Sequence, residues 1–131
     1  MSDLAKKLQK VHQSCHRAWA KAARDLALSF SEFEYLSAVQ EQADLQRYED
    51  KHGQHLQDIV EALGVTKASA STMIAKLEAR NLVSRFQCMM DARAQHIVLT
   101  PEGQMKLARG ARVYEQIATK LEKELGDMPS L

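Results

Sequence analysis

The sequence predicts a mainly helical domain with one small β-hairpin, and three observations lead to this fold class. Two short amphipathic helical patterns follow each other across a glycine turn between residues 56 and 79. Two short β-permissive runs come directly after them. Long helical patterns with continuous apolar stripes occupy both ends of the chain, at about residues 2–27 and 101–125. Together they predict a winged helix-turn-helix at about residues 30–100, flanked by long N- and C-terminal dimerisation helices.

Length and composition are those of one small intracellular domain. A chain of 131 residues can bury a core without disulfides or metals. The N-terminus lacks the apolar segment of a secretory signal, and no run approaches the ~18 apolar residues of a membrane span. Two cysteines, Cys15 and Cys88, without such a signal fit a reducing compartment. We therefore expect a cytoplasmic protein without membrane association.

The first predicted helix, residues 2–27, carries an apolar seam. Its members recur at spacings of four and three residues: Leu4, Leu8, Val11, Cys15, Ala18 and Ala22. A second helix follows, with Ser29 or Ser31 as its N-cap and Glu34 at capping-box distance from Ser31. The polar residues 48–53 after it are predicted to form a loop. The inner stripe of the second helix is Phe33, Leu36, Val39 and Ala43.

The helix-turn-helix comes next. Its first helix has apolar residues at i, i+3, i+4 and i+7: Leu56, Ile59, Val60 and Leu63. Gly64 ends that helix, because glycine enters the left-handed region at little cost, and Thr66 is an N-cap candidate for the second helix. The second helix repeats the spacing with Ala70, Met73, Ile74 and Leu77. The remaining positions face outward: Lys67, Ala68, Ser69, Ser71, Thr72, Ala75 and Lys76.

This outward face is suited to DNA. Slim side chains let a helix backbone approach the major groove, and hydroxyls and amines reach base edges and phosphates. A helix face that only meets solvent would more often carry Glu and Gln. Between Lys67 and His96 the sequence has five cations and two anions, a local excess of positive charge on a chain of net charge +1. Further phosphate-contact candidates are Arg80, Arg85 and Lys106.

The two β-permissive runs, Leu82–Gln87 and Gln95–Thr100, predict a β-hairpin. Its tip carries Asp91 and Arg93. A hairpin directly after a recognition helix is a wing, and an arginine at its tip can enter a narrow minor groove, where the potential is most negative.

The last predicted helix begins with Thr100 as N-cap and Pro101 at the first helical position, and it ends at Gly126. Its apolar seam is Leu107, Ala111, Tyr114, Ala118, Leu121 and Leu125. One small domain cannot easily cover this seam and that of the first helix along their full length. We therefore expect a homodimer built on the first and last helices. The alternative is a three-helix core that absorbs both seams within one chain.

Several segments resemble the MarR family of winged-helix transcription regulators, over about Ser31 to Glu124. They are, in order, Leu77–Val83, Asp91–Arg93 and Leu99–Gly103. The resemblance implies one MarR-like domain over residues 1–131, with Arg93 in the minor groove and Asp91 holding it. MarR-like proteins usually carry a further short helix where this chain stops at Leu131. The expected DNA-binding residues are Lys67, Ala68, Ser69, Ser71, Thr72, Lys76, Asp91 and Arg93.

The first helix raises two alternative triggers. His12 and His16 share a helix face at i, i+4 and could chelate a metal, with His52 and His55 as further ligands. Cys15 between them could sense oxidants, which requires a lowered thiol pKa. The plainer interpretation is an inert seam cysteine between solvated histidines, with no metal.

The predicted function is a sequence-specific double-stranded DNA-binding transcription regulator, a ligand-responsive repressor acting as a homodimer on a pseudo-palindromic operator. The resemblance implies a small, often aromatic effector between the dimerisation helices and the DNA-binding lobe. We expect no cofactor and no enzymatic activity, because no catalytic motif is present. The alternatives are a winged-helix adaptor that binds proteins without binding DNA, and a regulator triggered by a metal or by oxidation.

Overall fold

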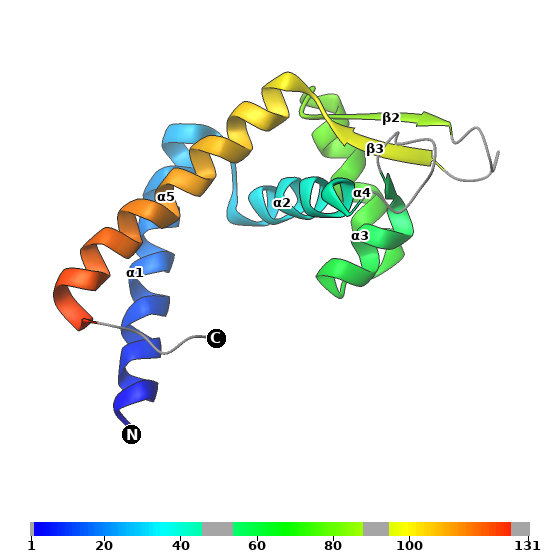
Figure 1. Cartoon of the computed structure of the whole chain (residues 1–131). Helices are drawn as coiled ribbons and strands as arrows, with labels where there is room; N and C mark the ends of the chain where they lie inside the picture. The colour runs from blue at the N-terminus through cyan, green and yellow to red at the C-terminus, as the bar shows by residue number, and fades with distance from the viewer. Residues whose placement is uncertain (1, 46–53, 88–94, 127–131) are drawn as a thin grey trace. The chain divides into compact units, whose positions relative to one another are not determined.

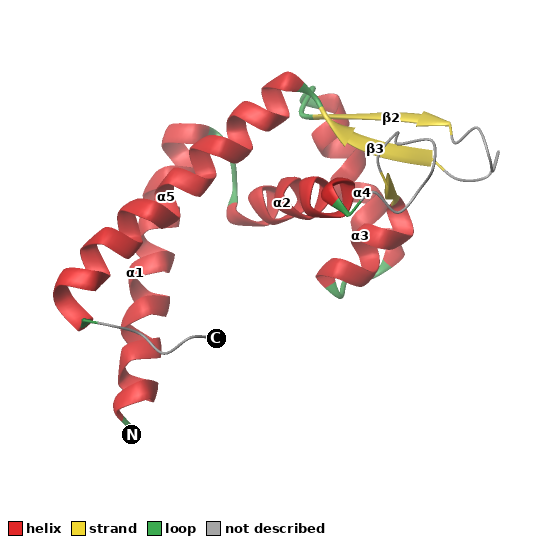
Figure 2. Cartoon of the chain, in the orientation of Figure 1, coloured by secondary structure: helices red, strands yellow, loops and turns green. Residues whose placement is uncertain are grey.

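The computed structural model describes residues 2–45, 54–87 and 95–126, and it confirms the predicted fold class: helices with a small winged sheet (Figures 1 and 2). No described helix is long and apolar enough to cross a membrane. The elements are α1 (Asp3–Leu26), α2 (Phe30–Asp44), β1 (Gln54–His55), α3 (Leu56–Leu63), α4 (Lys67–Ala79), β2 (Val83–Gln87), β3 (Gln95–Leu99) and α5 (Pro101–Leu125).

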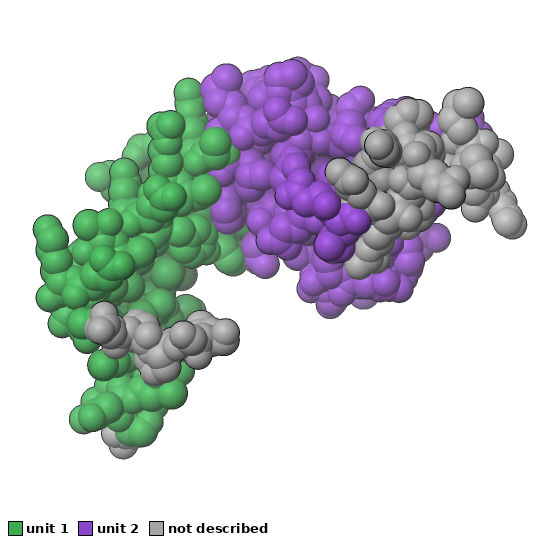
Figure 3. All heavy atoms as spheres, in the orientation of Figure 1, with its two compact units in different colours: residues 1–30, 108–131 green, residues 31–107 purple. Residues whose placement is uncertain are grey.

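The chain divides into two compact units (Figure 3). Unit 1 comprises residues 1–30 and 108–131, and so contains α1 and most of α5. Unit 2 comprises residues 31–107, and so contains the helix-turn-helix, the sheet and the start of α5.

The core of unit 2 forms from the apolar stripes of α2, α3 and α4. The side chains in it that are fully buried are Leu36, Val39, Ile59, Ala70, Ile74 and Leu77. Gly64 ends α3 with φ at 66°, and its amide donates to the Val60 carbonyl. Thr66 Oγ1 caps α4 by accepting from the Ser69 amide at 3.1 Å. The helix-turn-helix prediction is therefore confirmed at both ends of its turn.

The predicted capping role of Ser31 is wrong. The second helix, α2, begins at Phe30, so Ser29 stands directly before it and Ser31 already lies in the first turn. An N-cap residue has a non-helical backbone, which Ser31 lacks.

The sheet has three antiparallel strands in the order β1-β3-β2, where the sequence predicted two. β2 pairs with β3 from Val83↔Leu99 to Gln87↔Gln95. β1 adds the pairs Gln54↔Ile97 and His55↔His96. Two polar residues have no strand periodicity, so this third strand arises from backbone pairing that only the fold supplies. The predicted loop at residues 48–53 and the wing tip with Asp91 and Arg93 lie outside the described residues.

Hydrogen bonds join the start of α5 to the residues just before β2. Thr100 Oγ1 accepts from the Gly103 amide at 2.9 Å and donates to the Asn81 carbonyl at 2.7 Å. The Thr100 amide donates to the Leu82 carbonyl at 3.1 Å. The predicted cap at Thr100 and helix start at Pro101 are therefore confirmed.

In unit 1, α1 is capped by Ser2 and closed by Ala27 in the left-handed region. Trp19 is 5% exposed and packs edge-on against Phe30, with ring centroids 5.6 Å apart, and beside Tyr114 at 5.9 Å.

The two predicted apolar seams are covered only in part. Leu4 and Leu8 on α1 are each 44% exposed. On α5, Ile117 and Leu121 are buried, whereas the seam residues on its other side are exposed: Ala111, Tyr114 and Ala118. A single chain therefore leaves part of each seam open to solvent.

Candidate nucleic-acid interface

The candidate interface is the outward face of α4. Its apolar side, which contains Ala70, Ile74 and Leu77, is buried in unit 2, so the opposite side is open. The recognition-helix residues predicted to bind DNA are all exposed: Lys67, Ala68, Ser69, Ser71, Thr72 and Lys76. The other two predicted contacts, Asp91 and Arg93, lie outside the described residues.

The hydroxyl groups on this face have defined hydrogen-bonding capacity. Thr66 Oγ1 donates to Ser69 Oγ at 2.9 Å, so Ser69 keeps its own proton to donate outward. Thr72 Oγ1 donates to the Ala68 carbonyl at 3.0 Å, so Thr72 presents its lone pairs as an acceptor. The Ser71 hydroxyl has no partner among the described residues and can take either role. The face thus offers a donor, an acceptor and an adaptable hydroxyl, the groups that base edges require.

The two lysines of this face are available for phosphate. Neither Lys67 nor Lys76 forms an ion pair within the part of the chain that the structure describes. The only acid on α4 is Glu78, and it accepts from Arg85 Nε at 3.2 Å and from Arg85 Nη2 at 2.8 Å. The hydrogen bond from Arg85 lowers the pKa of Glu78. The acid is therefore neutralised locally, and α4 presents unopposed positive charge.

A partly buried ion pair holds the far end of α4, and no pattern in the sequence predicts it. Arg80, the C-cap residue of α4, donates through Nη1 to Glu32 on α2, whose side chain is 6% exposed. The two residues lie 48 positions apart, and no local pattern connects them. Arg80 and Arg85, predicted as phosphate-contact candidates, are thus both held by carboxylates of the fold.

Three aromatic rings pack together at the sheet, and one of them belongs to His55, a candidate metal ligand. His96 on β3 is fully buried, stacked on Phe86 with ring centroids 5.6 Å apart and edge-on to His55 at 4.7 Å. The His55 amide donates to Asp58 Oδ2 at 2.9 Å. His55 therefore joins β1 to the start of α3, and its ring packs on a core histidine.

The remaining candidate sites on α1 do not converge. His12 and His16 are exposed, and Cys15 is half-buried. Burial raises the pKa of the Cys15 thiol, the opposite of what an oxidant sensor requires. Within the described ranges, no three side chains of His, Cys, Asp or Glu are grouped to hold a metal ion. His52 and Cys88 lie outside those ranges.

Residues 31–94 match the family model described as "MarR family". The match covers α2, the helix-turn-helix, β2 and the segment that leads to β3. The chain belongs to the MarR family. Members of this family are winged-helix transcription regulators, as the three MarR-like segments of the sequence predicted.

Solved MarR-family structures share the fold. The reduced form of MarR from E. coli superposes with a TM-score of 0.75 at 19% identity, over 95% of this chain and 85% of that one. The S. aureus MepR–DNA complex gives 0.71 at 17% identity, over 92% and 82%. Bordetella bronchiseptica BpsR, whose DNA binding is regulated by 6-hydroxynicotinic acid, gives 0.65 at 22% identity, over 92% and 85%. No curated protein sequence matches the chain.

Proposed function

We propose that this MarR-family chain is a sequence-specific double-stranded DNA-binding transcription regulator that acts as a homodimeric, ligand-responsive repressor. The observation that carries the proposal is the outward face of α4. On a slim, exposed helix it combines two lysines without ion pairs among the described residues, a hydroxyl donor, a hydroxyl acceptor and a hydroxyl that can take either role. Such a face suits a major groove, because its small side chains let the backbone come close to the bases.

The wing completes the proposed interface. β2 and β3 run antiparallel toward the segment that contains Arg93, which the MarR resemblance assigns to the minor groove. Asp91 is proposed to hold this arginine. S. aureus MepR, which has the same fold, has been solved in complex with DNA.

The exposed seams support dimerisation. Leu4, Leu8 and Tyr114 remain open on α1 and α5 of a single chain. Large apolar side chains left exposed along two helices favour association with a second copy. Two copies of α4 held by such an interface would match half-sites about one helical turn apart. A ligand that binds better to a dimer with wrongly spaced recognition helices would release the operator.

A binding experiment on duplex DNA tests the proposal. Fragments selected by the purified protein from genomic DNA serve as the probe, and affinity is measured by fluorescence anisotropy across a salt series. We expect Lys67→Ala and Lys76→Ala to weaken binding on all sequences and to lower the salt slope by about 0.9 for each lost phosphate contact. Ser71→Ala should relax base preference instead. Lys6→Ala, an exposed lysine on α1, is the matched control.

Arg93→Ala tests the wing. It should weaken binding to sites flanked by narrow, A·T-rich minor grooves more than binding to other sites. If no duplex is bound even at low salt, the chain is not a DNA-binding regulator, and the adaptor alternative takes its place.

A further inference from the structure

The hydroxyl group of Thr72 lies on the outward face of α4 with its proton already in use. Thr72 Oγ1 donates to the Ala68 carbonyl at 3.0 Å, one turn back along the same helix. The direction of this bond is fixed, because a carbonyl oxygen can only accept. The lone pairs of Thr72 Oγ1 therefore remain for an incoming group, and that group must be a hydrogen-bond donor.

The neighbouring positions leave Thr72 accessible to a base. Thr72 is exposed, and so are Ala68 and Ala75, which lie about one turn away on either side and carry only methyl groups. Lys76, also one turn away, can extend its long side chain toward a phosphate. Within residues 2–45, 54–87 and 95–126, no donor occupies the lone pairs of Thr72 Oγ1. A base edge can therefore come within hydrogen-bonding distance of this oxygen.

The two serine hydroxyls of the same face keep their own protons. Ser69 Oγ accepts from Thr66 Oγ1, and Ser71 Oγ has no partner in the part of the chain that the structure describes. Each serine can therefore donate to a base, and each still has a lone pair with which to accept. A hydroxyl of this kind pairs with either sort of base edge. Among these three hydroxyls, only that of Thr72 is restricted by the fold before DNA arrives.

The major groove offers donors on only two of the four bases. Adenine presents its N6 amino group and cytosine its N4 amino group, whereas guanine and thymine present only acceptors there. An oxygen that can only accept pairs with an amino group and is repelled by a carbonyl oxygen. To donate instead, Thr72 would have to break its bond to Ala68, which costs about threefold to tenfold in affinity.

We propose that Thr72 is a specificity-determining residue that selects an amino-bearing base, adenine or cytosine, at one position of each half-site. Every base pair carries one amino group and one carbonyl group in the major groove, on opposite strands. The selection is therefore for the strand that carries the amino group, and exchanging A·T for T·A at that position should remove the contact. This inference rests on the proposed function, because it names what the α4 face would read.

Base analogues that lack only the amino group test the proposal. The probe is the duplex selected from genomic DNA, in which each adenine of a half-site is replaced in turn by purine and each cytosine by pyrimidin-2-one. Fluorescence anisotropy measures the affinity of wild type, Thr72→Val and Thr72→Ser for each duplex. Valine keeps the branched shape of threonine without the hydroxyl, and serine keeps the hydroxyl without the methyl group.

Two controls separate the contact from other effects. The analogues also weaken the Watson–Crick pair, so their effect on Thr72→Val supplies the baseline of a double-mutant cycle. Thr119→Val is the matched protein control, because Thr119 Oγ1 on α5 donates to the Glu115 carbonyl at 3.0 Å in the same way. Circular dichroism should show Thr72→Val folded like wild type, since Thr72 is exposed and valine has a similar helix propensity.

At one position of the half-site, we expect the analogue to weaken binding by wild type about threefold to tenfold more than binding by Thr72→Val. Thr72→Ser and Thr119→Val should behave like wild type. An equal effect on all proteins at every position would overturn the proposal, and so would a Thr72-dependent preference for guanine or thymine. If Thr72→Ser behaves like Thr72→Val, the hydroxyl alone does not read the base, and the proposal is equally overturned.

The proposed function and this inference can fail separately. A chain that binds duplex DNA with a steep salt dependence but shows no Thr72-dependent amino preference contradicts this inference alone. A chain that binds no duplex even at low salt contradicts the regulator function, and this inference with it.

Discussion

Replacing Gly103 with alanine should destabilise the protein, although alanine is the better helix former. Gly103 lies in the first turn of α5 and backs onto the chain just before β2. A Cβ at this position would overlap the carbonyl oxygen of Leu82 and lie 3.0 Å from the carbonyl carbon. Backbone atoms cannot rotate away as the end of a side chain can, so α5 or the start of β2 must move.

Two opposing contributions decide whether Gly103→Ala stabilises or destabilises the protein. Glycine to alanine within a helix stabilises by at most about 1 kcal/mol. Overpacking a well-packed contact costs about 1–3 kcal/mol, and the upper end applies where the obstacle is backbone. The displacement would also strain the bond from the Gly103 amide to Thr100 Oγ1 and that from the Thr100 amide to Leu82. We therefore expect a net loss of about 2 kcal/mol.

Urea unfolding monitored by Trp19 fluorescence and by circular dichroism measures this loss. For a domain of this size it corresponds to a fall in Tm of roughly 8 °C. Gln104→Ala, at the exposed neighbouring position, is the matched control and should be neutral or slightly stabilising. A Gly103→Ala protein as stable as wild type would show that α5 is not held against Leu82 as described.

Three further predictions concern charged side chains and Cys15. Glu32→Gln should lower the free energy of unfolding in urea by about 1–3 kcal/mol. This is less than the loss for a fully buried ion pair, because the Arg80 side chain is 31% exposed. Adding Arg80→Gln should recover part of the loss. Cys15 should be alkylated by iodoacetamide at pH 7 more slowly than in the urea-unfolded chain, since burial raises its pKa; faster reaction would contradict this. The hydrogen bond from Arg85 lowers the pKa of Glu78 in the folded state. The pair is exposed, so it stabilises the fold by less than about 1 kcal/mol. This stabilisation is present above the ordinary glutamate pKa and disappears as the pH falls through the lowered pKa. Wild type should therefore exceed Glu78→Gln in Tm at neutral pH and match it in acid.

Features that depend on neighbouring residues were predicted from the sequence, whereas contacts between distant residues were not. The turn at Gly64 and the caps at Thr66 and Thr100 were all predicted, because each depends on hydrogen bonds within about four residues. Apolar periodicity likewise predicted which side of α4 is buried. The same local reasoning left two candidate N-caps for α2, Ser29 and Ser31, and the helix start at Phe30 excludes Ser31.

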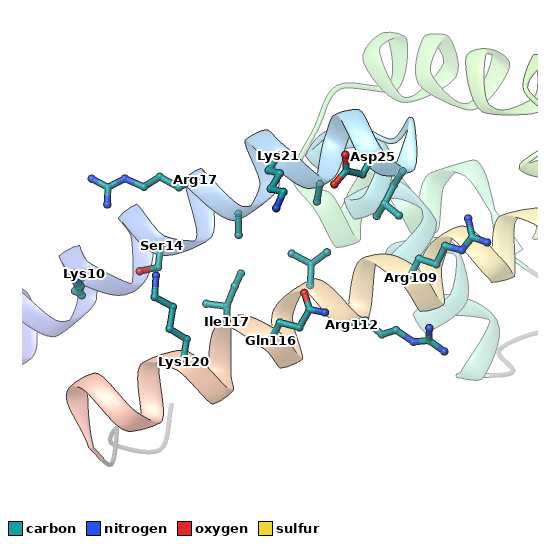
Figure 4. A pocket seen from close by; sticks show the side chains of 14 residues that line it. Lys10, Ser14, Arg17, Lys21, Asp25, Arg109, Arg112, Gln116, Ile117 and Lys120 are labelled. Atoms are coloured by element: carbon teal, nitrogen blue, oxygen red, sulfur yellow. The ribbon is translucent and has the colours of Figure 1, made fainter.

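The sequence by itself determined the helices, the turn, the wing strands and the exposed face of α4, because residues close along the chain decide periodicity and capping. Only the tertiary structure brought Glu32 to Arg80, His55 to His96 and Gly103 to Leu82. Only it gathered cations of α1 and α5 around a cavity of about 720 Å³ within unit 1 (Figure 4). Each of these contacts joins residues far apart in sequence, so the folded backbone, and no local pattern, places them together.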